Sequence, residues 1–433
     1  MSRETLGVLG AGWVGLVTAA CFAELGHAVV VRDVVPERIA DLEAGRLPIY
    51  EPGLAELVER NRERLTFTLD AGAVFAAAGT VFVCVGTPPT YSGDADLSAV
   101  WRVLDELGEA VEIGGGTILV MKSTVPVGTG EKVRAELDAR GLARVVYVSN
   151  PEFLAEGTAV EDFLHPDRIV VGAFREEEGE TVTALYGDLG APVVHTDVAS
   201  AEMIKYASNA FLATKISFIN EIANVCEETG ADVEVVAQGM GLDPRVGRHF
   251  LRAGLGFGGS CFPKDVSALK QLAGNSGYHF QLLTAVIEVN ELQKRRVVGK
   301  LVRHLGPLRG KTVALLGLAF KPNTNDLREA SSLVLASRLL AEGAHVRGWD
   351  PVALDEARSV MTGVELHDDL IEALRGADAA VIVTEWDEVR GFPYEEARNA
   401  MRTAVLIDGR NLLDPREARA ARFAYEAIGR PGA

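Results

Sequence analysis

The chain has 433 residues, of which 48% are hydrophobic and 24% charged, and its formal net charge is −18. This composition is ordinary for a globular protein with two or three domains, and the negative charge disfavours nucleic acid and anionic membranes as partners. The cysteines are widely spaced without a CxxC pair, which argues against a disulfide framework or a metal cluster. We therefore expect a cytoplasmic protein without a metal site.

The N-terminal segment predicts a dinucleotide-binding unit. A buried strand over 6–10 runs into Gly10-Ala-Gly-Trp-Val-Gly15, a helix follows, and a second strand over 28–31 ends near Asp33. In this Rossmann fingerprint the pyrophosphate lies at the helix N-terminus and the acid binds the ribose hydroxyls. Residues 5–23 carry no charge and could also form an export signal, but the glycine spacing and the second strand favour the dinucleotide turn.

The acid at the end of the second strand also bears on the choice of cofactor. A carboxylate at this position favours NAD over NADP. Arg32 and Arg38 lie near Asp33 in the sequence and are cations that would weaken this preference.

Further apolar strands over 80–85, 117–121 and 145–148 end in polar segments. Ligands bind at the carboxyl ends of parallel strands, so side chains from these segments are candidates for one crevice, although each alone could be a turn or cap residue. These candidates are Thr87, Thr124, Glu152 and Glu156.

Residues 199–229 predict one long helix, since the span contains neither Gly nor Pro. At 1.5 Å per residue it would be about 45 Å long, enough to bridge domains and support a subunit interface. Lys205 and Asn209 are four residues apart and share a face of this helix, either as functional groups or as a solvated pair. Helical patterns continue from Val233 to about Leu305.

A glycine-rich loop interrupts that helical region. Four glycines occupy the six positions from Gly254 to Gly259, and Cys261 and Pro263 follow. Glycine lets the backbone approach a ligand, and proline suits a first helical turn, so Cys261 would lie near a helix N-terminus and close to Lys264. The helix N-terminus and the Lys264 cation both favour the thiolate form of Cys261. A loop with an incidental cysteine is the alternative.

A second strand–helix–strand pattern covers 311–317, 331–343 and 344–350, with further strands over 379–383 and 404–407. The segment from Arg416 is expected to be helical or frayed. We therefore predict an α/β protein with two Rossmann-like doubly wound domains, 1–198 and 306–433, joined by a long central helix and helical segment, 199–305.

A cysteine beside a hydride acceptor suggests aldehyde oxidation, in which a thiolate adds to the aldehyde, hydride leaves and water cleaves the thioester. The chain also resembles the UDP-glucose 6-dehydrogenases, a branch of the nucleotide-sugar dehydrogenases, over nearly its whole length. The motifs that carry this resemblance are Gly10-Ala-Gly-Trp-Val-Gly15, Leu47-Pro-Ile-Tyr-Glu-Pro-Gly53, Lys122-Ser-Thr-Val-Pro-Val127, Asn150-Pro-Glu-Phe-Leu-Ala-Glu156, Gly256-Phe-Gly-Gly-Ser-Cys-Phe-Pro-Lys-Asp265 and Phe320-Lys-Pro-Asn323.

Two short segments distinguish branches of the family, and three positions depart from the family's pattern. The His165-Pro-Asp-Arg168 run is more similar to the UDP-glucose branch than to the GDP-mannose branch, and the Ser-Cys-Phe-Pro loop argues against the N-acetylhexosamine branch. Trp13 replaces a frequent tyrosine, Val35 a common second acid after Asp33, and Asn325 a frequent aspartate.

The resemblance implies two successive oxidations of UDP-glucose to UDP-glucuronate, with two NAD and one water. It implies a nucleophilic Cys261, oxyanion stabilisation by Lys205 and Asn209, a water held by Asp265 and Thr124, and Glu152 as general base. The implied cofactor residues are Gly10, Gly12, Val14, Gly15, Asp33, Arg38, Thr87, Thr124, Glu156, Lys264 and Arg328. The implied substrate residues are Glu152, Phe153, Leu154, Lys205, Asn209, Arg245, Phe250, Leu251, Arg252, Gly254, Gly258, Phe320, Lys321 and Arg410.

Within the substrate set, the resemblance implies that Phe250–Gly254 face uracil, that Lys321 meets phosphate, and that Arg245 reaches the sugar of a neighbouring subunit in a homodimer. Three alternatives remain. The substrate is GDP-mannose or another nucleotide hexose, the enzyme is a one-step NAD-linked alcohol dehydrogenase with a structural Cys261, or the protein binds nucleotide sugars without catalysis.

Overall fold

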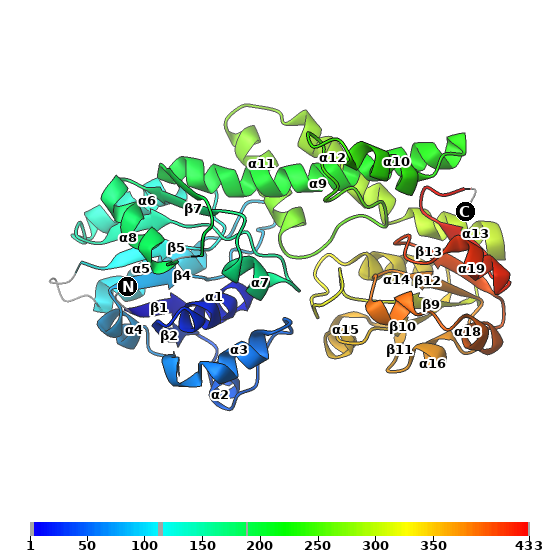
Figure 1. Ribbon diagram of the computed structural model, residues 1–433, viewed down its shortest axis with the longest axis horizontal. Coiled ribbons are helices and arrows are strands. Elements are labelled where there is room, and N and C mark those ends of the chain that lie inside the picture. The colour runs from blue at the N-terminus through cyan, green and yellow to red at the C-terminus, as the bar shows by residue number, and fades with distance from the viewer. Residues whose placement is uncertain (1–3, 111–115, 188, 432–433) are drawn as a thin grey trace. The chain divides into compact units, whose positions relative to one another are not determined.

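The computed structural model describes residues 4–110, 116–187 and 189–431. The chain divides into two compact units (Figure 1): unit 1 comprises Met1–Ser208 and Gln271–Ser276, and unit 2 comprises Asn209–Lys270 and Gly277–Ala433. Two helices, α9 (Val198–Thr229) and α11 (Phe262–Asn275), contribute residues to both units.

Unit 1 contains an eight-stranded sheet with the order β3-β2-β1-β4-β5-β6-β7-β8. All its neighbouring strands are parallel except β6 and β7, which are antiparallel. The first six positions have the strand order of a doubly wound nucleotide-binding fold. The strands are β1 (Thr5–Leu9), β2 (Ala28–Arg32), β3 (Leu65–Thr68), β4 (Thr80–Val83), β5 (Ile118–Met121), β6 (Val146–Ser149), β7 (Ile169–Ala173) and β8 (Val193–Thr196).

Helices cover both faces of this sheet, because its central strands β1, β4, β5 and β6 are almost wholly buried. On one face Phe22 of α1 packs against Phe82 of β4 and Phe163 of α7, and on the other Val74, Val103 and Leu137 belong to a separate cluster. The helices are α1 (Trp13–Glu24), α2 (Pro36–Glu43), α3 (Leu54–Arg60), α4 (Ala71–Ala77), α5 (Ser98–Ala110), α6 (Thr129–Ala139), α7 (Ala159–Leu164) and α8 (Glu176–Leu185).

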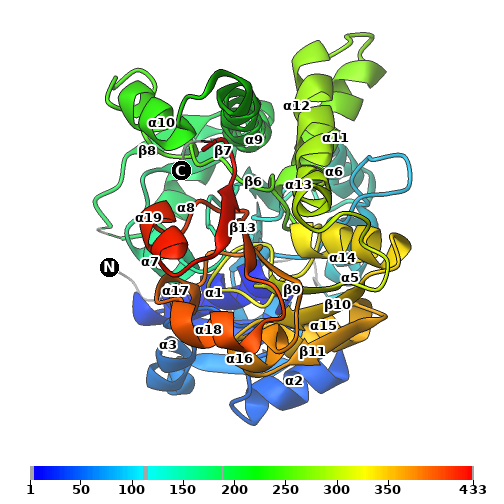
Figure 2. The ribbon, with the colours of Figure 1, turned by 90° about the vertical axis from the view of Figure 1, so that its right-hand side faces the viewer.

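Unit 2 contains a six-stranded, fully parallel sheet with the order β11-β10-β9-β12-β13-β14. Its strands are β9 (Thr312–Leu316), β10 (His345–Trp349), β11 (Val364–His367), β12 (Ala379–Ile382), β13 (Val405–Asp408) and β14 (Ala424–Ala427). The helices are α10 (Val233–Gly241), α12 (Gln281–Gln293), α13 (Arg296–Leu305), α14 (Ser331–Ala341), α15 (Leu354–Val360), α16 (Leu370–Leu374), α17 (Asp387–Arg390), α18 (Tyr394–Ala400) and α19 (Pro415–Ala420). Helices α16 and α18 pack beside each other (Figure 2).

The predicted fold class of two doubly wound α/β domains with a long central helix is confirmed. The prediction for the segment from Arg416 is wrong in part, because α19 ends at Ala420 and the edge strand β14 follows. This short strand has little pattern of its own. It is held by pairing with β13 and by a 2.9 Å hydrogen bond from the Tyr425 hydroxyl to Asp408.

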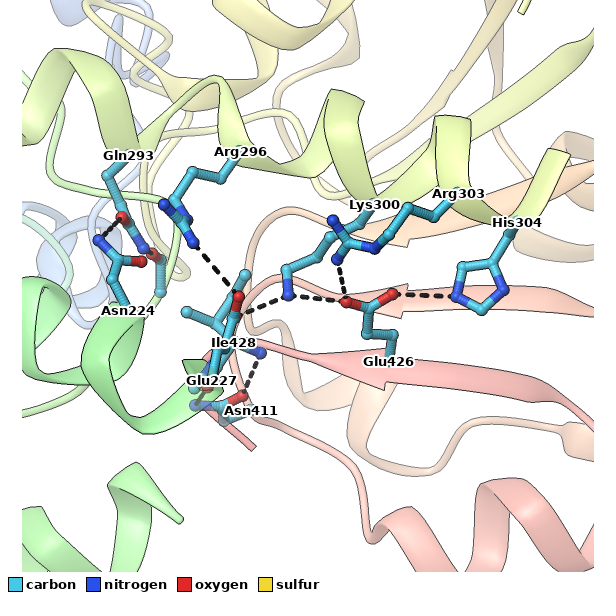
Figure 3. Close-up of polar contacts among 12 residues, drawn as sticks. Asn224, Glu227, Gln293, Arg296, Lys300, Arg303, His304, Asn411, Glu426 and Ile428 are labelled. Atoms are coloured by element: carbon cyan, nitrogen blue, oxygen red, sulfur yellow. Dashed lines mark hydrogen bonds and ion pairs between the residues drawn. The ribbon is translucent and has the colours of Figure 1, made fainter. Parts of the chain in front are cut away.

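A buried cation links three elements of unit 2 (Figure 3). Lys300 of α13 is 2% exposed, and its Nζ lies 2.6 Å from Glu227 of α9 and 2.9 Å from Glu426 of β14. Burial alone would raise the pKa of Glu227. The hydrogen bonds that its carboxylate accepts from the Gly429 amide and from Lys300 outweigh this effect and lower the pKa. A lowered carboxylate pKa stabilises the fold at neutral pH, and this contribution is lost as the pH falls through that pKa.

The Lys300→Ala variant is expected to lower the free energy of unfolding by about 3 kcal/mol, because it leaves Glu227 and Glu426 partly buried without their shared cation. Arg303 contacts the same Glu426 at 2.6 Å but its side chain is 61% exposed, so Arg303→Ala is the matched control and should cost about 1 kcal/mol or less. Urea denaturation followed by circular dichroism measures both. Equal losses in the two variants would contradict the importance of burial.

Candidate functional site

The turn after β1 has the geometry that a bound pyrophosphate requires. Gly10 has φ +101°, and a Cβ there would lie 2.6 Å from the Cys84 carbonyl oxygen. A Cβ on Gly15 would lie 1.8 Å from the Gly10 carbonyl oxygen, so α1 packs tightly against the turn. At Gly12, in contrast, a Cβ would meet no atom within 4 Å. The turn is therefore open at the N-terminus of α1, which fits a dinucleotide, and Val14 lies in the first turn of that helix.

Asp33 lies directly after β2 and is buried. Its Oδ2 accepts hydrogen bonds from the Ala11 amide at 2.7 Å and from Arg38 at 2.9 Å, and its Oδ1 accepts one from the Val35 amide at 3.0 Å. The acid thus joins the glycine turn to the end of β2. A cavity of about 290 Å³ in unit 1 brings together the predicted residues Gly10, Gly12, Asp33 and Arg38.

The predicted residues at the ends of β4 and β5 also meet. The Thr87 hydroxyl donates a 2.8 Å hydrogen bond to the carbonyl oxygen of Thr124. The segment after Thr124 is held by Glu202 of α9, which accepts hydrogen bonds from the Gly128 and Gly130 amides at 2.7 and 2.8 Å. Burial raises the pKa of Glu202 to about 7 against the opposing effect of these two amides.

Glu152 and Lys205 form a buried ion pair in unit 1, with Nζ 2.9 Å from Oε1. Lys205 also lies 5.4 Å from the centre of the Phe153 ring, and the Arg168 guanidinium stacks on that ring at 3.6 Å. Arg168 is therefore a site residue that the sequence prediction missed. Arg168 ends the His165-Pro-Asp-Arg168 run, but nothing in the sequence spacing of that run indicates that its side chain reaches Phe153. The Leu154 amide donates a 2.6 Å hydrogen bond to Glu152.

A second buried acid connects the cofactor turn with the residues that follow Glu156. Glu51 accepts hydrogen bonds from the Trp13 indole at 2.9 Å, the Gly157 amide at 2.7 Å and the Ala159 amide at 2.8 Å. Tryptophan and tyrosine both carry a polar hydrogen at the end of a large ring. The contact to Glu51 thus accounts for the presence of Trp13 where the family often has tyrosine.

Cys261 differs from the other three cysteines in its environment. It immediately precedes α11 and is partly exposed, and its Sγ lies 3.6 Å from the Ser260 hydroxyl. The other cysteines are buried, and burial raises the pKa of Cys84 to about 12 and those of Cys21 and Cys226 above the ordinary thiol value. The predicted position of Cys261 at a helix N-terminus is confirmed, and the other thiols are shielded from chemistry.

Asp265 lies in the first turn of α11 and is 1% exposed. Its Oδ2 accepts a 2.6 Å hydrogen bond from the side-chain amide of Asn209, and its Oδ1 lies 2.7 Å from Lys264 Nζ. Unit 2 therefore brings three predicted residues into one cluster, and two of them, Lys264 and Asp265, follow Cys261 closely in the sequence. Lys264 is predicted to bind the cofactor, and in the structure its ammonium group pairs with the Asp265 carboxylate.

Buried amides hold the glycine loop in place. Asn290 accepts a hydrogen bond from the Phe257 amide at 2.7 Å and donates one to the Phe257 carbonyl at 3.0 Å. Asn220 accepts from the Gly254 amide at 2.8 Å, and Gln293 donates to the Gly254 carbonyl at 2.9 Å. The sequence prediction missed these partners, since all three lie more than 30 residues from the loop.

Arginine side chains lie near the glycine loop. Arg410 contacts the Gly256 carbonyl at 3.4 Å, and both Arg410 and Arg252 pair with Glu385, at 3.3 and 4.0 Å. A Cβ on Gly254 would lie 3.3 Å from the Arg410 guanidinium, so the absence of a side chain there leaves room for it.

The remaining predicted substrate residues, and the predicted cofactor residue Arg328, lie in varied surroundings. A Cβ on Gly259 would lie 2.7 Å from the Phe320 ring, and Lys321 lies 5.4 Å from the centre of that ring. A Cβ on Gly258 would abut the Glu329 carbonyl, Phe250 lies beside Phe262, and Leu251 packs in the hydrophobic core. Arg328 pairs with Asp326. Arg245 is exposed and pairs with Asp243.

Residues 4–110, 116–187 and 189–431 hold no group of three His, Cys, Asp or Glu side chains suited to a metal ion. None of their helices has the length and apolar character needed to cross a bilayer.

A doubly wound sheet with an open glycine turn and an acid after the second strand defines a dinucleotide-binding α/β protein. Three family models match the chain: the NAD binding domain over residues 4–190, the central domain over 199–292 and the UDP binding domain over 314–415, all of the UDP-glucose/GDP-mannose dehydrogenase family. The chain belongs to the UDP-glucose/GDP-mannose dehydrogenase family, and its cofactor is NAD.

Several relatives are similar over nearly the whole chain. UDP-glucose 6-dehydrogenase TuaD of Bacillus subtilis is 47% identical, with 99% of this chain and 94% of the relative covered. UDP-glucose 6-dehydrogenase of Pseudomonas aeruginosa is 48% identical, covering 98% and 97%. The solved structure of a UDP-glucose dehydrogenase from Pyrobaculum islandicum has a TM-score of 0.91 at 42% identity, covering 98% of this chain and 97% of that one.

Proposed function

We propose that this enzyme oxidises the C6 alcohol of UDP-glucose to the carboxylate of UDP-glucuronate in two steps. The observation that carries the proposal is Cys261, which is partly exposed immediately before α11, in the same unit as the Asn209–Asp265–Lys264 cluster. The relatives named for UDP-glucose support the substrate assignment. The three family models support 1–198 as the NAD domain, 199–305 as the central segment and 306–433 as the nucleotide-sugar domain.

The proposed chemistry assigns each step to a side chain. When bound, NAD accepts a hydride from C6 in each of the two oxidations. In the first, the C6 hydroxyl loses its proton to a base and an aldehyde forms. The Cys261 thiolate then adds to C6, and the resulting thiohemiacetal is oxidised to a thioester. Water attacks this carbonyl carbon, the C–S bond breaks, and the acid and the thiol are released.

The other proposed roles follow from charge. Lys205 and Asn209 stabilise the oxyanions that develop at O6, since a cation and an amide donor suit that task. Glu152 is the general base of thioester hydrolysis, while Asp265 and Thr124 hold the water. Arg410, Arg252 and Lys321 supply the positive charge that a pyrophosphate needs in a chain with a net charge of −18.

Incubation with NAD and a panel of nucleotide sugars tests the substrate and the number of oxidations. UDP-glucose should give two NADH per molecule and the highest kcat/KM, whereas GDP-mannose and UDP-N-acetylmannosamine should react slowly. One NADH per UDP-glucose, with the aldehyde as final product, would indicate a one-step alcohol dehydrogenase. A higher kcat/KM with another sugar would reassign the substrate.

The Cys261→Ala variant is expected to lose carboxylate formation by a factor of about 1000 or more, about 4 kcal/mol in transition-state free energy, because the thioester cannot form. Cys261→Ser should accumulate an ester, since an alkoxide is a poorer leaving group than a thiolate. Mass spectrometry of the sugar product and of the intact protein measures both effects.

The buried Cys226, also in unit 2, provides the control, and Cys226→Ala should retain two oxidations per substrate. Circular dichroism checks that each variant is folded. Substantial UDP-glucuronate from folded Cys261→Ala would exclude the covalent mechanism.

We infer that the enzyme forms a homodimer through α9. This helix carries Phe211, Phe218 and Val225 at seven-residue intervals on one face, and their exposed fractions are 65%, 48% and 57%. An exposed apolar stripe on a helix suits pairing with the same stripe of a second copy. Arg245 would then act on the sugar bound by the partner subunit.

Phe218→Glu should convert the dimer to a monomer in multi-angle light scattering, because the pairing would bury two carboxylates. Val360 of α15 is 54% exposed elsewhere in unit 2, so Val360→Glu is a matched control that should leave the mass unchanged. A dimer that persists in Phe218→Glu would place the interface on another surface.

A further inference from the structure

Three arginines, Arg32, Arg38 and Arg102, line the cavity that contains Asp33, the acid predicted to bind the cofactor ribose. Arginines near this acid ordinarily accommodate the 2′-phosphate of NADP. Arg38 pairs with Asp33 itself at 2.9 Å. Arg32 is the last residue of β2, and its side chain turns to a different partner, Glu106 of α5, at 2.5 Å. Arg32 and Arg38 are therefore each already paired with a carboxylate, whereas Arg102, which also lines the cavity, has an exposed side chain.

Glu106 is positioned by the packing of α5. Val103 and Leu107 on the same helix are buried in the core of unit 1, which fixes the helix against the sheet. The side chains of Arg32 and Glu106 are only 12% and 20% exposed, so their interaction is screened less than that of a surface pair. Arg32 also donates a 3.3 Å hydrogen bond to the Leu69 carbonyl, which further fixes its direction.

Both members of this pair line the cavity that contains Gly12 and Asp33. The second oxygen of Glu106, Oε2, is buried and accepts no hydrogen bond from the described residues. A carboxylate oxygen of this kind can accept a hydrogen bond from a hydroxyl or amino group but repels a phosphate. The cavity thus has a second negative group besides Asp33, contributed by a helix distant in the sequence.

We propose that Glu106 is a specificity-determining residue, which with Asp33 sets the preference for NAD over NADP. Glu106 holds Arg32 in an ion pair, so this guanidinium is not available to a 2′-phosphate. Its own negative charge adds to that of Asp33 and repels the phosphate. The inference concerns the cofactor alone and is independent of the sugar substrate and of Cys261.

Binding of NADH and NADPH, followed by nicotinamide fluorescence without any sugar, tests this role. Glu106→Gln should lower the ratio of the NADPH Kd to the NADH Kd at least about tenfold, because it removes a repulsive charge and releases Arg32. Arg32→Gln should act in the opposite direction and raise the ratio, since Glu106 would then be an unpaired carboxylate. The double variant should lose most of the gain seen in Glu106→Gln.

Glu109 is exposed on the same helix, and Glu109→Gln is the control for the loss of one negative charge. It should leave the ratio unchanged. If Glu106→Gln weakens both cofactors equally, or changes neither, the residue is structural and the proposal fails. If NADPH binding improves equally in the double variant, Arg32 has no part in selectivity. Because Arg32→Gln predicts a change of opposite sign, the proposal remains testable if Glu106→Gln does not fold.

Discussion

In both sheets, the turn after the first strand of the nucleotide-type unit depends on a buried carboxylate that accepts hydrogen bonds from backbone N–H groups of that turn. In unit 1, Asp33 follows β2 and accepts the Ala11 amide from the turn after β1. In unit 2, Asp350 follows β10 in the same way and accepts the Leu318 and Ala319 amides from the turn after β9, at 2.7 and 3.0 Å. Buried amides without an acceptor would cost several kcal/mol, so an acid at this point is a structural requirement of both sheets.

The two acids differ in what else they contact. Asp350 is fully buried and accepts a further 3.0 Å hydrogen bond from the Trp386 indole, which closes its surroundings. Asp33 instead lines a cavity beside the open Gly12. An acid after the second strand therefore does not by itself mark a nucleotide site. The open turn next to it distinguishes the cofactor-binding unit from its structural counterpart.

Sequence reasoning succeeded where the signal is local. The glycine turn, the 32-residue helix α9 and the position of Cys261 before α11 all follow from contiguous residues. It missed partners supplied by remote elements, such as Arg168 on Phe153 and Asn290 on Phe257. It also missed the buried strand β7 and the strands β3, β8, β11 and β14, in which no more than two residues are buried. These four strands lack a continuous buried apolar run and are stabilised chiefly by pairing with neighbouring strands.

The edge position of β14 has a consequence for the solubility of shortened chains. It covers β13, whose residues Val405, Leu406 and Ile407 are fully or almost fully buried. A chain that ends before Ala424 would expose this apolar strand with unpaired backbone groups, a template for intermolecular β-pairing. The last strand therefore protects the sheet against aggregation, and its Glu426, bound by Lys300, Arg303 and His304, anchors that protection to α13.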